Sequence, residues 1–79
     1  MEFITDRISI NENICGGKPI IRGKRITVET ILEFLTAGDK VEDILHQYPS
    51  LEEEDIYACL QFALKLIKRK YIVKEVAYA

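Results

Sequence analysis

The clearest hydrophobic periodicity in this chain predicts a helix that begins just after Thr27. Four apolar residues lie there at the spacing of one helical face: Val28, Ile31, Leu32 and Leu35. Thr27 suits the N-cap, because its hydroxyl can accept a hydrogen bond from an otherwise unpaired helical amide. Gly38 suits the left-handed residue that ends many helices. The pattern therefore predicts a first helix between Thr27 and Gly38.

A second, shorter helix is predicted from about residue 40 to residue 47. Its apolar stripe consists of Val41, Ile44, Leu45 and Tyr48. Pro49 ends it, because proline lacks the amide that would continue the helical ladder. The connection to the next helix is therefore only a few residues long.

The third predicted helix opens at Ser50 or Glu52 and runs to about residue 70. Ser50 with Glu53 fits a capping box, and the acidic residues there suit the positive end of the helix dipole. The predicted inward stripe consists of Ile56, Leu60, Ala63, Leu64 and Ile67. Residues 71–73 are β-branched and aromatic, so the helix should give way there to a strand or an ordered tail.

The residues before Thr27 predict strands and turns. Ile8 and Ile10 alternate with polar residues, which predicts a short strand with both isoleucines on one face. Four residues are expected to shape the turns that follow: Gly16, Gly17, Pro19 and Gly23. The run from Arg22 to Arg25 predicts a tight turn between two short strands, with Gly23 in the left-handed conformation.

These elements predict an α+β fold that is mainly α. Short N-terminal strands with a β-hairpin precede a trihelical, homeodomain-like unit of the helix-turn-helix type. The 79 residues fit one domain, with a strand and cationic hairpin over 1–26, three helices over 27–70 and a tail over 71–79. So small a domain has a thin core, and the strand of Ile8 and Ile10 and the hairpin should leave open sheet edges. We therefore expect a homodimer that pairs those edges across subunits.

Charge is segregated along the chain, although the net charge is only −2. Residues 1–28 hold five basic and three acidic residues, residues 29–64 hold one and nine, and residues 65–79 hold five and one. Lys and Arg supply affinity for phosphate, so a nucleic-acid contact should use the basic ends. The four carboxylates of residues 52–55 would repel DNA from the start of the third helix. The DNA-binding candidates are therefore the hairpin cations Lys18, Arg22, Lys24 and Arg25.

The sequence offers no recognisable catalytic or metal-binding constellation. His46 stands alone, and Cys15 and Cys59 lie far apart, so we expect two unpaired thiols and no metal site. The glycine run that ends at Lys18 lacks the spacing of a phosphate-binding loop. No run of about 18 apolar residues predicts a membrane span, and the first residues lack the order of a signal peptide. We therefore expect a cytoplasmic protein that is not an enzyme and needs no cofactor.

The chain resembles a small bacterial and archaeal family, the domain of unknown function 433, from Ile14 through Ala63. The matching residues are Ile14-Cys15-Gly16-Gly17-Lys18-Pro19, Ile21-Arg22-Gly23, Arg25-Ile26, Val28, Ala37-Gly38, Ile44-Leu45, Tyr48-Pro49, Leu51, Asp55-Ile56 and Ala58. Three positions depart from the usual pattern. Lys24 stands where a small residue is usual, and Lys40 and Glu52 stand where a helix-capping Ser or Thr is usual.

The resemblance implies a VapB-like antitoxin that neutralises a PIN-like ribonuclease toxin and binds the operator DNA of its own operon. It implies no catalytic residues. The active site of such a nuclease is acidic and metal-dependent, so an inhibitor can place Lys or Arg against its carboxylates. The toxin-binding candidates are Lys68, Arg69, Lys70, Tyr71, Ile72, Val73 and Lys74, followed by the hairpin. The alternative for the apolar residues of this tail is that they fold back on the sheet of the domain itself. The alternatives are a stand-alone DNA-binding regulator and a structural or adaptor dimer without nucleic acid.

Overall fold

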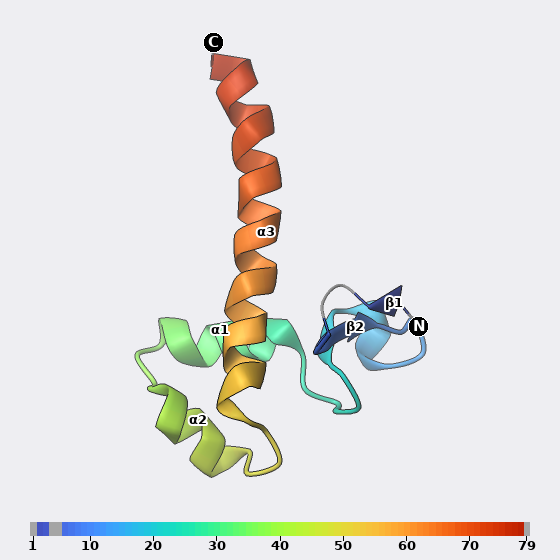
Figure 1. The fold of residues 1–79 in the computed structure, drawn as a ribbon, viewed down its shortest axis with the longest axis vertical. Helices are drawn as coiled ribbons and strands as arrows, with labels where there is room; N and C mark the ends of the chain where they lie inside the picture. Colours follow the sequence, from blue (N-terminus) through green and yellow to red (C-terminus); the bar gives the residue numbers. More distant parts are fainter. Residues whose placement is uncertain (1, 4–5, 79) are drawn as a thin grey trace.

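Three short antiparallel strands and three helices follow one another along the chain, in the α+β arrangement that the sequence predicts (Figure 1). The computed structural model describes the backbone of residues 2–3 and 6–78 and the side chains of residues 6–68. The strands are β1 (Glu2–Phe3), β2 (Ile8–Ile10) and β3 (Ile20–Ile21), and a turn of 3₁₀ helix, η1 (Cys15–Gly17), precedes β3. The helices are α1 (Val28–Thr36), α2 (Val41–Gln47) and α3 (Glu53–Tyr78).

The sheet has the order β1-β2-β3, with β2 in the centre. Ile8 pairs with Ile21, and both belong to the hydrophobic core. Ser9 pairs with Ile20, and these two residues are also buried. Because β2 lies between two strands of the same chain, the open edges expected for this strand do not exist. A homodimer remains a prediction, but it needs a surface other than the edges of β2.

The predicted ends of α1 are confirmed. Thr27 is the N-cap, and its side-chain oxygen accepts a hydrogen bond from the amide of Thr30 at 3.0 Å. At the other end Gly38 has a φ of +99°, and the amide of Asp39 donates to the carbonyl of Phe34 at 3.0 Å. This is the Schellman arrangement, in which a left-handed glycine lets the chain satisfy the last carbonyls of the helix.

Helices α2 and α3 begin with the same device, although neither begins with Ser or Thr. The amide of Lys40 donates to Oδ2 of Asp43 at 2.9 Å, and the amide of Glu52 donates to Oδ2 of Asp55 at 2.8 Å. In each case the third residue of the helix is an aspartate, and its carboxylate accepts a hydrogen bond from the amide of the residue that precedes the helix. The predicted capping box that begins at Ser50 is therefore wrong, whereas Glu52, the alternative opening residue, directly precedes α3.

The core lies where β2, α1 and α2 meet the first half of α3. It consists of Ile8, Ile21, Val28, Ile31, Ile44, Leu51, Ile56, Ala58, Cys59 and Phe62. The predicted inward stripe of α3 is largely wrong, since Leu60, Leu64 and Ile67 are 43 %, 51 % and 59 % exposed. The helix turns a different face inward, and its second half extends beyond the other elements, where they do not cover it (Figure 1).

The backbone of α3 remains helical through Tyr78. The strand or separate tail predicted for residues 71–73 is therefore wrong. Once a long helix is nucleated, each added residue gains a hydrogen bond, and this outweighs the weak strand preference of a few β-branched residues. The side chains at 69–78 lie outside the described part of the structure.

Candidate functional site

The glycine loop before β3 makes a left-handed turn. Cys15, Gly16 and Gly17 have φ values of 52°, 67° and 82° in succession. The amide of Lys18 closes the turn by donating to the carbonyl of Cys15 at 3.3 Å. A Cβ atom is unfavourable in the left-handed region of positive φ, so a turn with three consecutive residues in this region needs glycine at most of them. The two glycines therefore serve the turn, as predicted, and Cys15 is held in an unusual conformation beside them.

The cationic hairpin turn forms as predicted. Gly23 has a φ of +75°, and the amide of Lys24 donates to the carbonyl of Ile21 at 2.9 Å. A positive φ at the third residue of four is the pattern of a type II turn. The returning strand is shorter than predicted, because the hairpin ladder ends in a single bridge between Ile20 and Thr27.

The four DNA-binding candidates do not gather on one surface. Lys18 lies beside α1, where its Nζ is 3.2 Å from Oε1 of Glu29. Arg22 and Lys24 line a hollow of about 180 Å³ at the start of α3, together with Ser50, Glu52 and Asp55. Arg25 is exposed. The hairpin thus carries its cations on two sides, and those at the turn face the acidic start of α3.

The acidic start of α3 is partly neutralised by Arg7, a residue that nothing in the local sequence distinguishes. Nη1 of Arg7 donates to Oδ1 of Asp55 at 2.8 Å and to Oε1 of Glu52 at 2.9 Å. These hydrogen bonds, first to Glu52 and then to Asp55, raise the pKa of the Arg7 guanidinium. Asp55 is buried and also caps α3, so this carboxylate holds two parts of the chain together. Its role is structural.

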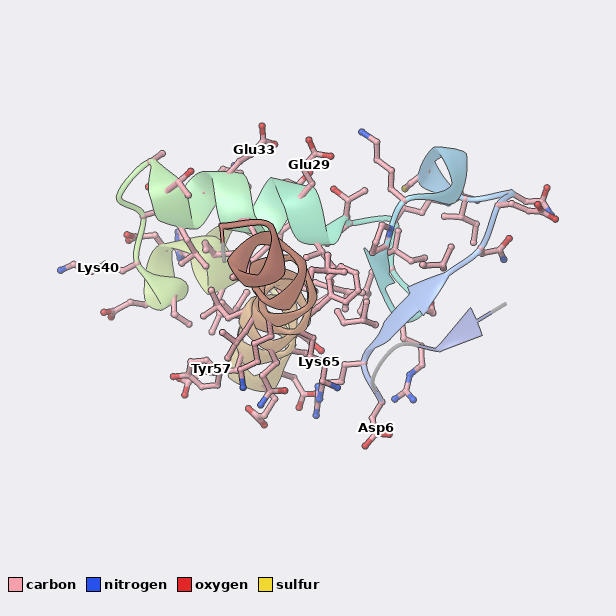
Figure 2. All side chains as sticks on the ribbon, turned by 90° about the horizontal axis from the view of Figure 1, so that it is seen from above. Asp6, Glu29, Glu33, Lys40, Tyr57 and Lys65 are labelled. Carbon is pink, nitrogen blue, oxygen red and sulfur yellow. The ribbon has the colours of Figure 1, made fainter. Side chains whose placement is uncertain are left out.

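The second half of α3 is an arm whose first residues, 64–68, carry exposed apolar and basic side chains. We call residues 64–78 the α3 arm. Leu64, Leu66 and Ile67 are between 41 % and 59 % exposed. Lys65 and Lys68, which alternate with them in the sequence, are also exposed. Figure 2 looks down α3 and shows Lys65 on the side away from α1. Lys68 is the only toxin-binding candidate whose side chain is described, and it is exposed.

An apolar groove of about 370 Å³ runs between α1 and α3. Its lining includes Pro19, Val28, Leu32, Phe62 and Leu66, and Lys18, Glu29 and Glu33 also border it. Nothing in the local sequence marks this groove, because its lining comes from α1, α3 and the residues before β3, which meet only in the folded chain.

The described residues contain no cluster of three or more metal-ligating side chains. Both cysteines are free, with Cys15 half-buried and Cys59 buried. Burial, and secondarily the charge of Asp55, raises the pKa of the Cys59 thiol to about 12. A thiol that stays protonated at neutral pH is a poor nucleophile, so Cys59 acts as a core residue.

The profile of the family described as "Protein of unknown function (DUF433)" matches residues 8–63. The chain belongs to this family. The matched segment contains the glycine loop, the hairpin and the first half of α3. Arg7 and the α3 arm lie outside it. The family match therefore covers the folded body, and the α3 arm continues beyond it.

Two relatives are informative. The chain is 37 % identical over 49 residues to "Uncharacterized protein y4eO" from Sinorhizobium fredii (strain NBRC 101917 / NGR234), across 62 % of this chain and 22 % of that protein. The chain thus spans only about a fifth of this relative. A crystal structure of a DUF433 member protein from Anabaena variabilis ATCC 29413 superposes with a TM-score of 0.75 at 30 % identity, covering 92 % of this chain and 70 % of that one. In the described part of this chain no helix is both long and apolar enough to cross a membrane.

Proposed function

We propose that this chain is an antitoxin that binds and neutralises a PIN-like ribonuclease through the α3 arm. The observation that supports this most is that α3 leaves the core with apolar side chains exposed around it: Leu64, Leu66 and Ile67. Exposed apolar surface on a small domain is typical of a protein interface. The arm needs a partner to cover it, and its basic residues suit an acidic one.

The proposed inhibition works by charge competition. A PIN-like nuclease binds its metal ions through clustered carboxylates, and a Lys or Arg side chain placed among them occupies the same oxygens. The residues that we expect to do this are Lys68, Arg69, Lys70 and Lys74, with Tyr71, Ile72 and Val73 anchoring the arm to the apolar rim of the site. The folded body positions the arm against the nuclease.

The same antitoxin is proposed to bind operator DNA through its hairpin. Arg22 and Arg25 are exposed at the turn. The start of α3, where a conventional helix-turn-helix protein reads bases, carries Glu53 and Glu54 on its surface. Their charge disfavours phosphate, so we assign DNA contact to the hairpin.

Co-expression with a PIN-like nuclease encoded beside this chain tests the proposal. The full chain is expected to co-purify with the nuclease and to stop its RNA cleavage, whereas a chain truncated after Lys70 is expected to do neither while keeping its helical circular dichroism. Arg69→Glu is expected to weaken inhibition, and Lys40→Glu is the matched control, since it makes the same kind of charge reversal on α2, away from the arm. A folded, truncated chain that still inhibits fully would place the inhibitory surface elsewhere. Absence of any complex would favour the stand-alone regulator or the adaptor dimer.

A further inference from the structure

One face of α3 carries apolar residues at the spacing of a coiled-coil seam. Tyr57, Leu60, Leu64 and Ile67 alternate in steps of three and four, as positions a and d of a heptad do. All four are at least 43 % exposed. The helical backbone continues to Tyr78, and in the sequence the same spacing reaches Tyr71. We call the four described residues the α3 seam.

The core does not use this seam. Among the described side chains of α3, the buried ones are Asp55, Ile56, Ala58, Cys59 and Phe62. Ala63 and Leu66 line the groove beside α1. Figure 2 shows Tyr57 on the side of α3 away from α1, so the seam points outward. A protein-sized partner can therefore lie along it without displacing anything from the core.

The charges that flank the seam indicate what the partner is. Glu54, Gln61 and Lys68 lie at intervals of seven residues, all exposed, along one edge of the seam. This edge is acidic at its start, neutral in the middle and basic at its end. In an antiparallel pair of helices the equivalent edges of the two copies meet, so Glu54 of one copy faces Lys68 of the other and the two Gln61 residues meet at the centre. The edge is thus complementary to itself.

We infer that the α3 seam pairs with the seam of a second copy of this chain, antiparallel and about a two-fold axis near Gln61. Such a contact is isologous, so each favourable pair occurs twice. It gives this small domain the additional apolar burial that its thin core lacks. Leu66 and the groove beside α1 stay uncovered, whereas Leu64, Ile67 and Lys68 lie in the pair, so a nuclease that binds these three residues competes with the second copy.

Light scattering on the chain alone tests this inference without a nuclease, so the result is independent of the proposed function. We expect a dimer at micromolar concentration and a monomer of 9.1 kDa on dilution. Leu64→Glu is expected to weaken dimerisation by at least roughly tenfold, because both copies place a charge in the apolar seam. Leu66→Glu is the matched control, since it changes an exposed leucine of the same helix outside the seam, and it should leave the dimer intact.

Charge reversal and cross-linking test the orientation. Glu54→Lys and Lys68→Glu should each weaken the dimer, and the double variant should restore it. In a Cys15→Ser background, Gln61→Cys should form a covalent dimer on mild oxidation, because only an antiparallel pair brings the two copies of this position together. A 9.1 kDa species at all concentrations, or a dimer that survives Leu64→Glu, would overturn the inference. A dimer that requires the seam but forms no Gln61→Cys cross-link would overturn its antiparallel orientation.

Discussion

Arg7 and Asp55 are 48 residues apart in the sequence, and their side chains meet at 2.8 Å. The contact ties the residue before β2 to the first turn of α3. The Asp55 side chain is only 8 % exposed, and its second oxygen caps the helix. One carboxylate therefore fixes both where α3 begins and how the sheet lies against it.

Removing this carboxylate should destabilise the fold. Asp55→Ala leaves the amide of Glu52 without its cap and the Arg7 guanidinium without its buried partner, and we expect a loss on the order of 2–3 kcal/mol in the free energy of unfolding. Glu42→Ala, which removes an exposed carboxylate in the first turn of α2 and outside the α3 seam, should change it by less than about 0.5 kcal/mol. Urea denaturation followed by circular dichroism measures both. Equal effects of the two variants would mean that the Arg7–Asp55 contact does not stabilise the domain.

Local signals predicted what is local in this fold. Thr27, Gly38 and Gly23 act through their own backbone or through neighbours three to five residues away, and the structure confirms all three positions. The Arg7–Asp55 contact could not be predicted in this way, because neither residue differs locally from any exposed charge. The contact forms only when the sheet packs against α3, so local sequence patterns do not reveal it.

The predicted inward face of α3 is wrong for a different physical reason. This helix has two apolar faces, and periodicity alone favours the face with the larger residues, Leu60, Leu64 and Ile67. The core instead uses the face of Ala58, Cys59 and Phe62, and α3 contacts α1 and β2 through it. The exposed apolar face of Leu60, Leu64 and Ile67 is the one to which the proposed pairing of α3 assigns a second copy.

The buried thiol of Cys59 should make stability depend on alkaline pH. Burial raises its pKa to about 12 in the folded chain, whereas an unfolded thiol titrates near its ordinary value. Below the ordinary pKa both states hold the proton, and above it the unfolded state loses the proton first. Stability therefore falls as pH rises toward 12, by roughly 1 kcal/mol per pH unit.

Cys59→Val removes this titration while keeping a small apolar side chain, and Cys15→Ser is the matched control at the half-buried thiol. Thermal melts between pH 8 and pH 11 should show a shallower decline for Cys59→Val than for the parent chain and an unchanged decline for Cys15→Ser. Identical slopes in all three proteins would show that Cys59 is not the group responsible.

The turn at Gly23 should tolerate side chains according to their backbone preference alone. Its φ is +75°, and a Cβ atom built there meets nothing within 4 Å. Gly23→Val should therefore cost about 1–2 kcal/mol through backbone strain, because a β-branched residue is especially unfavourable in this region. Gly23→Asn should lose clearly less, since asparagine tolerates the left-handed conformation. Chemical denaturation compares the two, and a loss for asparagine as large as that for valine would point to a contact of the turn instead of strain.

Binding of DNA, as proposed, should depend on the hairpin turn and not on the start of α3. Replacing Arg22, Lys24 and Arg25 together by Ala should abolish binding to the DNA upstream of the gene in a gel-shift or anisotropy titration. If each contacts a phosphate, single replacements should each lower the slope of log affinity against log salt by about 1. Lys18→Ala should matter less, because Glu29 already faces that ammonium at 3.2 Å.

Glu53→Gln and Glu54→Gln should leave binding intact or strengthen it, since they remove charge that repels phosphate. Loss of binding in these glutamine variants, with the alanine variants unaffected, would instead identify α3 as the element that contacts DNA.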